Sequence, residues 1–384
     1  MKHWIVVFLC SLLTACATGP GLQSPESLLR DELFAAPPER PSAEQIFAVS
    51  PAMKRYLNQD IAGQIHAKGR IHGLIDALYT PGQLKLEYDS SMTRTAAEAF
   101  DAKSGNCLSL VIMTAAFARE MGLPVRFQGV YVDEVWARIG GILFANGHVN
   151  LTLGELRSHS RVKTSENVPL TVDFFLPELS GQPRTWPLSE ETIIAMYFNN
   201  RAAEAMSQGD LNQAYWFTRE AIRQDPKYLA AQNTLGVVYR RHGNLREAEA
   251  VLNNVLAREP GNINSLSNMA VVLKDQGRHT EAVALNERIE KMRPYPPFHF
   301  FDLGMTAMRE RDFAKARDLF AKEVERAAYN DEFHFWLGAA YMGLGQADLA
   351  RKHIMLAMEN SLNKRDHDLY ASKLAKIRGA DHRS

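Results

Sequence analysis

A spacing of 34 residues recurs through the second half of the chain and constrains its fold more than any other feature of the sequence. Three sets of small or turn-forming residues follow this spacing: Pro226, Pro260 and Pro294; Gly209, Gly243 and Gly277; Ala214, Ala248 and Ala282. Gly304 and Gly338 continue the register without proline. A period of this length is typical of paired antiparallel helices that stack on their neighbours, so the pattern predicts an all-α superhelical array.

One repeat shows which array this is. It contains Leu235, Gly236, Tyr239, Gly243, Ala248, Leu252 and Pro260, and this series resembles the tetratricopeptide (TPR) repeat. The resemblance implies an array over 195–364, with repeats at 195–228, 229–262, 263–296, 297–330 and 331–364. Because an array needs a polar surface at its open end, residues 365–384 are expected to form a capping helix, at 366–378, and a tail.

The first helix of each repeat is expected to line a concave groove. In this register the middle repeats present polar and basic residues: Asn233, Arg240, Asn264 and Lys274. The last two repeats present apolar residues: Phe298, Phe301, Met305, Met308, Phe335 and Met342. We expect such a groove to bind a peptide or the tail of a protein partner. The alternative is that these residues lie in solvent or contact the rest of the chain.

In the first half, a buried helix is predicted to begin at Cys107. Residues 108–118 are apolar almost all round, which is typical of a buried helix, and Gly122 followed by Pro124 predicts its end. The backbone amides and the dipole of a helix N-terminus favour a negatively charged sulfur. The alternative is that Cys107 is a small buried apolar side chain, as most free cysteines are.

Helices and strands are predicted around this one. The expected helices lie at 50–62, at 70–78 and from Thr93 or Thr95 to Phe100. The expected strands, rich in β-forming residues, lie at 125–132, 147–153 and 170–175. Residues 134–143 are broken by glycine and are expected to form a loop, strand or flap. These elements predict an α+β domain over 50–190.

Two of the predicted strands carry residues that complement a reactive thiol. His148 lies in the second strand, and Asp173 interrupts an otherwise apolar third strand, where aspartate is uncommon. A thiol nucleophile needs a base for its proton and a third group that orients the base. Antiparallel neighbouring strands would place the histidine and the aspartate side by side. We therefore predict Cys107, His148 and Asp173 as a catalytic triad.

These residues also carry a resemblance. Gly105 with Cys107, the turn over 122–126, His148 and Asp173 are similar to the core of the transglutaminase-like superfamily, whose active site is papain-like. The resemblance covers roughly residues 60–180 and departs at 149–150, where many members have an aromatic residue. It implies an α+β papain/transglutaminase-like domain. The family contains cross-linking enzymes, proteases, amidases and inactive members.

The N-terminus has the features of an export signal. Residues 4–13 are apolar but too few to span a bilayer, which is typical of a signal peptide. The series Leu13, Thr14, Ala15, Cys16 resembles a bacterial lipobox and implies removal of residues 1–15 and lipidation of Cys16, or else an ordinary secretory signal. Ala17 implies the periplasmic face of the outer membrane, with the inner membrane as the alternative. The proline-rich residues 16–49 are expected to be a tether.

Composition and the motifs that the sequence lacks argue against several classes of function. Lysine and arginine number 44, as do aspartate and glutamate, so no basic surface for nucleic acid is predicted. The chain has no glycine-rich phosphate loop and no cysteine-pair metal motif, and no metal or cofactor is predicted. We expect a cysteine protease or amidase, with hydrolysis favoured over acyl transfer. The alternatives are a non-catalytic adaptor with an inactive papain-like domain and a thiol sensor.

Overall fold

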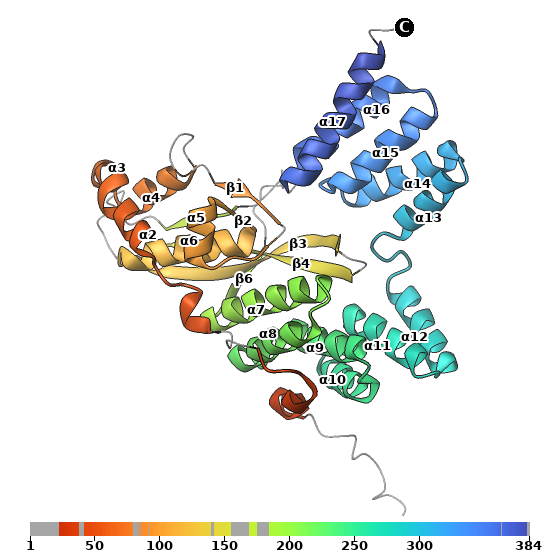
Figure 1. The fold of residues 1–384 in the computed structure, drawn as a ribbon, viewed down its shortest axis with the longest axis horizontal. Helices are drawn as coiled ribbons and strands as arrows, with labels where there is room; N and C mark the ends of the chain where they lie inside the picture. The colour runs from red at the N-terminus through yellow and green to blue at the C-terminus, as the bar shows by residue number, and fades with distance from the viewer. Residues whose placement is uncertain are drawn as a thin grey trace, which may run out of the picture.

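The computed structural model describes residues 23–37, 42–79, 84, 86–90, 92–139, 142–154, 169–174, 184–361 and 363–381. An α+β half comes first and a helical array follows it (Figure 1). The expected signal peptide, the lipidation residue Cys16 and the first residues of the expected tether lie outside the described residues.

The helices of the α+β half begin where the sequence predicts, except the one over Ala62–Lys68, which was not predicted. They are α2 (Pro51–Arg55), α3 (Ala62–Lys68), α4 (Arg70–Tyr79), α5 (Ala96–Ala102) and α6 (Cys107–Glu120). Ser50 Oγ accepts a hydrogen bond from Met53 N at 3.2 Å, and Thr95 forms a capping box with Glu98 at the start of α5. The expected helix over 50–62 is α-helical only over α2, because a π-helical turn (Tyr56–Asp60) follows it and α3 begins where the expected helix ends.

Four antiparallel strands form the sheet. They are β3 (Val125–Ile139), β4 (Ile142–Leu153), β5 (Leu170–Val172) and β6 (Thr185–Leu188), in the order β5-β4-β3-β6. The ambiguous segment 134–143 belongs to the long hairpin of β3 and β4 in its described part. A separate parallel pair, β1 (Glu87–Tyr88) with β2 (Ser104–Gly105), lies just before α6. This pair and β6 are absent from the sequence prediction.

The predicted buried helix is the centre of this half. Every residue of α6 from Leu108 to Ala118 is buried, and the left-handed backbone of Gly122 (φ 68°) follows its end. Val149, Leu151 and Leu153 of β4 are each at most 1 % exposed and share the core of α6. The apolar faces of α6 and β4 therefore cover one another.

The array consists of helix pairs, as predicted. The pairs are α7 (Glu190–Ser207) with α8 (Leu211–Gln224), α9 (Leu229–His242) with α10 (Leu245–Arg258), α11 (Ile263–Asp275) with α12 (His279–Met292), α13 (His299–Arg309) with α14 (Phe313–Arg326), and α15 (Asp331–Gly343) with α16 (Ala347–Asn360). Small residues lie where the helices cross: a Cβ on Gly236 would be 2.8 Å from Leu252, and one on Gly304 would be 2.6 Å from Phe320. The helix α17 (Lys364–Asp381) follows the last pair.

The array is divided, however, after its third pair. The buried side chains of the first three pairs belong to the same cluster as the α+β half, whereas those of α13 to α15 form a second cluster and those of α16 and α17 a third. Figure 1 shows the extended link between α12 and α13. This link contains Pro294, Pro296 and Pro297, which cannot donate backbone hydrogen bonds, and ends at Phe298 in a left-handed conformation (φ 65°). The predicted array therefore consists of two blocks, one on each side of this link.

The described part of the expected tether is not a free spacer. Residues 23–37 contain η1 (Pro25–Leu28) and η2 (Asp31–Leu33) and lie against α8, α9 and α10. Leu28 and Phe34 are 3 % and 6 % exposed, and the Phe34 ring stacks on Tyr215 with the centroids 4.1 Å apart. The apolar side chains between the prolines explain the difference, because burying them offsets the entropy of ordering the segment.

Candidate functional site

Cys107 is the first residue of α6. The N-cap Asn106 accepts a hydrogen bond from Ser109 N through Oδ1 at 2.9 Å, which satisfies one free amide of the helix N-terminus. Among the described residues Cys107 is a free, half-buried cysteine. Its sulfur therefore lies at the positive end of the helix dipole and remains accessible in part.

His148 and Asp173 are brought together by the pairing of β4 with β5. Leu151 is opposite Val172 in this antiparallel register, which places the following Asp173 beside His148 and Asn150. His148 Nε2 is 2.6 Å from Asp173 Oδ1, and Asn150 Nδ2 donates to Asp173 Oδ2 at 3.0 Å. The His148 side chain is 5 % exposed, so the contact with Asp173 is shielded from water.

The third contact joins His148 to the thiol. Burial of the imidazole lowers the pKa of His148, but hydrogen bonds to the Asp173 and Cys107 side chains, together with their negative charges, outweigh burial and raise the pKa to about 9. Because Nε2 contacts Asp173, Nδ1 is the ring nitrogen left for the sulfur. The arrangement places beside the Cys107 side chain an imidazole that can exchange a proton with it.

Tyr88 is a site residue that the sequence interpretation missed. Its hydroxyl is hydrogen-bonded to the Cys107 side chain and to the Cys107 backbone amide. Burial of the ring, followed by the charge of Cys107, raises the pKa of Tyr88 well above its usual value, so the phenol stays protonated. The alternation of Leu84, Leu86 and Tyr88 is the sequence pattern that could have predicted a strand here, although β1 itself contains only Glu87–Tyr88.

The polar residues predicted for the groove lie on α9 and α11. Asn233 Oδ1 accepts hydrogen bonds at 3.0 Å from Ser265 Oγ and from Asn268 Nδ2, and Arg240 forms an ion pair with Asp275 at 3.0 Å. Both residues therefore bridge neighbouring repeats. Asn264 is half-buried and Lys274 is exposed, so these two offer side chains to a ligand.

The apolar part of the predicted groove is largely interior. Phe298 and Phe301 are 1 % and 5 % exposed and belong to the core of α13 to α15, so neither can serve as a binding surface. Phe335 stacks on Tyr370 of α17 with the centroids 5.0 Å apart. These aromatic residues fill the second and third clusters because the division of the array leaves each block to build its own core. Met305 and Met308 are half-buried, and Met342 is 42 % exposed.

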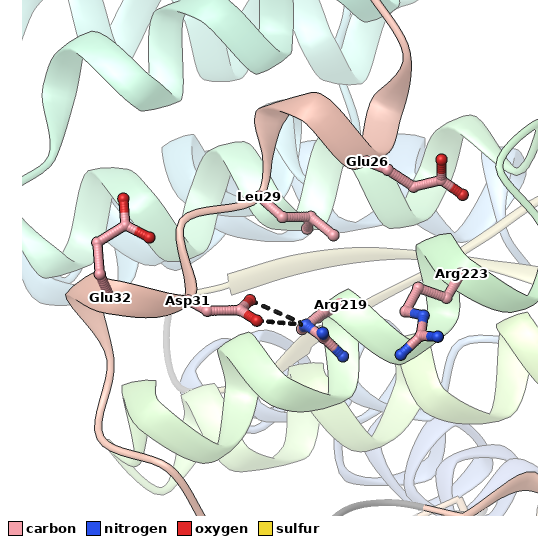
Figure 2. Close-up of a pocket in the computed structure, with 6 residues that line it drawn as sticks. All are labelled: Glu26, Leu29, Asp31, Glu32, Arg219 and Arg223. Carbon is pink, nitrogen blue, oxygen red and sulfur yellow. Dashed lines mark hydrogen bonds and ion pairs between the residues drawn. The ribbon is translucent and has the colours of Figure 1, made fainter.

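A surface pocket of about 520 Å³ lies between the 23–37 segment and α8. Figure 2 shows its lining, which consists of Glu26, Leu29, Asp31, Glu32, Arg219 and Arg223. Arg219 Nε is paired with Asp31 Oδ1 at 2.8 Å. The pocket is lined by the array and the segment that crosses it, and none of its lining residues belongs to the triad.

The described part of the chain bears on two further kinds of feature, a metal site and a membrane span. It contains no group of three or more histidine, cysteine, aspartate or glutamate side chains arranged to hold a metal ion. Within the same residues, none of the helices combines the length and the apolar character that crossing a membrane requires.

Comparisons with known proteins identify the repeats. Tetratricopeptide repeat models match residues 205–263 and 301–358, one in each block of the array. The TPR repeat-containing protein YvcD of Bacillus subtilis is 23 % identical over 155 residues, which are 39 % of this chain and 31 % of that protein. The TPR repeat-containing protein PA4667 of Pseudomonas aeruginosa is 27 % identical over 140 residues, which are 36 % and 24 % of the two chains. The chain thus spans less than a third of the length of these curated relatives.

Solved structures also match. PilF of Pseudomonas aeruginosa is 19 % identical, with a TM-score of 0.29, and the match covers 50 % of this chain and 87 % of that one. YrrB, described as a TPR protein with an unusual peptide-binding site, is 20 % identical, with a TM-score of 0.25, over 47 % and 92 %. TTC0263 of Thermus thermophilus is 18 % identical, with a TM-score of 0.30, over 47 % and 99 %. The family models over 205–263 and 301–358 show that the helical array carries tetratricopeptide repeats, as the sequence predicts.

Proposed function

We propose that this chain is a cysteine-dependent enzyme of transglutaminase-like type that acts on peptide or protein amides. The observation that carries the proposal is the chain of contacts from Cys107 through His148 to Asp173. Cys107 begins α6, His148 lies on β4 and Asp173 follows β5, and His148 contacts both of the others. A structural role for any one of them would not require the other two.

The arrangement supports a defined sequence of steps. The Cys107 thiolate attacks the amide carbonyl carbon, and the His148 imidazolium gives its proton to the departing amine, which leaves a thioester. His148, now neutral, takes a proton from water as the water attacks the thioester, and the acid product and thiolate are released. Asp173 keeps the imidazole oriented and stabilises its positive charge, and Asn150 in turn fixes Asp173.

Hydrolysis is favoured over acyl transfer to an amine. Transfer needs a second site that binds an amine and excludes water. Asp89 is the carboxylate next to Tyr88, and it is already paired with Arg94 at 2.9 Å. A lysine acceptor therefore has no evident anionic partner among the described residues beside Cys107.

The array is proposed to bind the polypeptide substrate or a protein partner. Tetratricopeptide repeats present extended concave surfaces that suit polypeptide segments. Lys274 and Asn264 on α11 are the predicted groove residues with side chains available to such a ligand. Anchoring of the chain to the periplasmic face of the outer membrane through lipid on Cys16, with the inner membrane as the alternative, belongs to the same proposal.

A non-catalytic adaptor is the second candidate. It is favoured by the two curated relatives, which are both named as TPR repeat-containing proteins. In an adaptor, the array binds partners, and loss of Cys107 leaves the function intact.

The two candidates are separated by trapping the acyl-enzyme. The purified protein is incubated with a periplasmic extract, quenched in acid and digested, and the peptide that contains Cys107 is examined by mass spectrometry. We expect an acyl adduct on Cys107 that is absent from the His148→Ala variant. An unmodified Cys107, together with normal function of Cys107→Ser in cells, would support the adaptor.

A further inference from the structure

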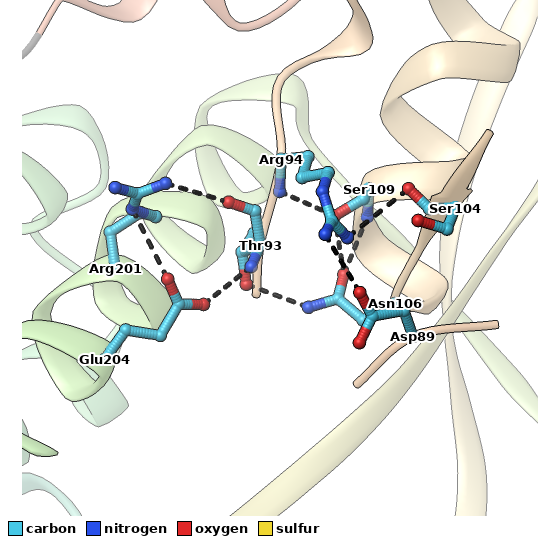
Figure 3. Close-up of polar contacts among 8 residues, drawn as sticks. All are labelled: Asp89, Thr93, Arg94, Ser104, Asn106, Ser109, Arg201 and Glu204. Carbon is cyan, nitrogen blue, oxygen red and sulfur yellow. Dashed lines mark hydrogen bonds and ion pairs between the residues drawn. The ribbon is translucent and has the colours of Figure 1, made fainter. Parts of the chain in front are cut away.

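The first helix of the array contacts the thiol helix near its C-terminal end and also contacts the loop that is hydrogen-bonded to its N-cap. Near the C-terminal end of α6, Arg119 donates from Nη1 and Nη2 to Glu190 Oε1 and Oε2 of α7, at 3.0 and 2.5 Å. Near the N-terminal end, Arg201 and Glu204 of α7 reach the loop before α5 (Figure 3). The array is therefore in contact with the surroundings of Cys107, and not only joined to them by the chain.

Thr93 is the residue that α7 holds. Its backbone N–H donates to Glu204 Oε1 at 2.7 Å, and its carbonyl accepts from Arg201 Nη1 at 3.1 Å. Arg201 Nε and Glu204 Oε2 are 3.4 Å apart, so the two side chains that hold Thr93 also hold each other. Thr93 is fully buried, and both of its backbone polar groups thus depend on α7 for their partners.

The side chain of Thr93 continues the chain of hydrogen bonds to the residue before the nucleophile. Thr93 Oγ1 accepts from Asn106 Nδ2 at 2.8 Å. The other end of the Asn106 amide accepts through Oδ1 from Ser109 N at 2.9 Å and from Ser109 Oγ at 2.8 Å. Arg94 N donates to Ser109 Oγ at 2.8 Å, which closes the network (Figure 3). Both ends of the Asn106 amide are therefore fixed.

These contacts bear on the reactivity of the thiol. Asn106 caps α6, and its orientation decides how the first turn of that helix, with Cys107 in it, is held. Burial raises the pKa of Glu204, while the Thr93 amide and Arg201 oppose this shift by stabilising the carboxylate. A partly buried network of this kind is sensitive to the loss of one member, because the remaining polar groups lose their partners.

We propose that Glu204 and Arg201, although they belong to the repeat array, are positioning residues for Cys107 and act on it through Thr93 and Asn106. The inference rests on the proposed cysteine chemistry and adds that the array is a structural part of the reactive site. Removing the carboxylate of Glu204 is expected to loosen the first turn of α6 and weaken its stabilisation of the thiolate.

The rate of Cys107 alkylation tests this inference without a known substrate. The full chain is treated with iodoacetamide between pH 5 and 10, and modification of the Cys107 peptide is followed by mass spectrometry. For Glu204→Ala we expect a rate at pH 7 lower by about fivefold, the order of a helix N-terminal charge effect, and a profile displaced to higher pH. Glu204→Gln keeps an oxygen that can accept from the Thr93 amide, so it is expected to retain more of the rate.

Glu249 supplies a matched control. It is also an array carboxylate paired with an arginine, Arg278, at 2.7 Å, and its side chain is 26 % exposed against 22 % for Glu204. Gln276 and Arg278, which donate hydrogen bonds to Glu249, both lie within the array. Glu249→Ala is therefore expected to alkylate at the wild-type rate with an unchanged profile.

A second variant protects the test against a folding defect. Thr93→Val removes the acceptor for Asn106 without altering α7, and it is expected to reproduce the slower rate and displaced profile. If Glu204→Ala folds and alkylates at the wild-type rate with the wild-type pH profile, the positioning role is wrong. If Glu204→Ala does not fold, the same result for Thr93→Val would overturn the role. If wild-type Cys107 itself reacts no faster than glutathione, the proposed cysteine chemistry fails instead, so the two failures are distinguishable.

Discussion

The imidazole of His148 and the carboxylate of Asp173 meet at 2.6 Å between Nε2 and Oδ1, although 25 residues separate them in the chain. Asn150, two residues after His148 on β4, donates to the other carboxylate oxygen at 3.0 Å. Asp173 is thus held by two side chains of one strand. It orients the ring whose other nitrogen is left for Cys107.

Asp173→Asn is expected to lower the rate of acyl-enzyme formation by about 10²- to 10⁴-fold, because the imidazole loses both its orientation and its counter-charge. The rate is measured by quenched-flow mass spectrometry of the Cys107 adduct. Thr171→Val is the control, since Thr171 lies on β5 and contacts Thr152 instead of His148. If Asp173→Asn unfolds the domain and the folded fraction keeps the wild-type rate, the aspartate is structural.

The titration of His148 is expected near pH 9, in line with its raised pKa. A histidine with a pKa raised above its unfolded value of about 6.5 stabilises the fold fully below that pH, and this contribution is lost as the pH rises through about 9. Amide cleavage should decline over the same upper range, because a neutral ring has no proton for the leaving amine. NMR of the ring measures the titration, and in Asp173→Asn the midpoint should move down.

Tyr88→Phe removes a hydroxyl that is hydrogen-bonded to Cys107 while keeping the ring. We expect slower alkylation of Cys107 at neutral pH, by about three- to tenfold, since one hydrogen bond to a charged group contributes roughly 1.5 kcal/mol or less here. Tyr56→Phe is matched in chemistry, because its hydroxyl donates to the Ala77 carbonyl and not to the site. Equal alkylation rates for the two variants would remove Tyr88 from the site.

The packing of segment 23–37 against the array predicts that this segment contributes to stability. Phe34→Ala deletes a buried ring stacked on Tyr215 and should lower the free energy of unfolding by about 3 kcal/mol, measured by urea denaturation. Glu32→Ala in the same segment changes an exposed side chain and should stay within about 0.5 kcal/mol of wild type. A negligible effect of Phe34→Ala would mean that the segment does not support the array.

Lipid anchoring is tested directly by Cys16→Ser. The variant should lose labelling by radioactive palmitate and should appear in the soluble periplasmic fraction. The reason is that serine has no thiol to carry the lipid that is proposed to hold the chain in the membrane. Cys107→Ser is the matched control and should keep both the label and the membrane fraction. Membrane retention and labelling of Cys16→Ser would rule out lipidation at this residue.

Much of the secondary structure could be predicted because its signals are local. The 34-residue spacing predicted the paired helices, the apolar run after Cys107 predicted α6, and alternation around His148 predicted part of β4. The two-residue strands β1 and β2 were missed, and Tyr88 with them, because a pair of residues carries no period. The π-helical turn that ends α2 likewise has no signature in the pattern of apolar residues.

The sequence by itself determined which residue types lie at the start of α6, on β4 and after β5, since helical and strand periods depend on neighbours a few positions away. Only the tertiary structure decided which residues these side chains contact. Thr93 bonds to Glu204 across 111 residues, and this contact exists because α7 packs beside α6. Packing also turned Phe298 and Phe301 from predicted groove residues into core, because a block separated by three prolines must bury its own apolar side chains.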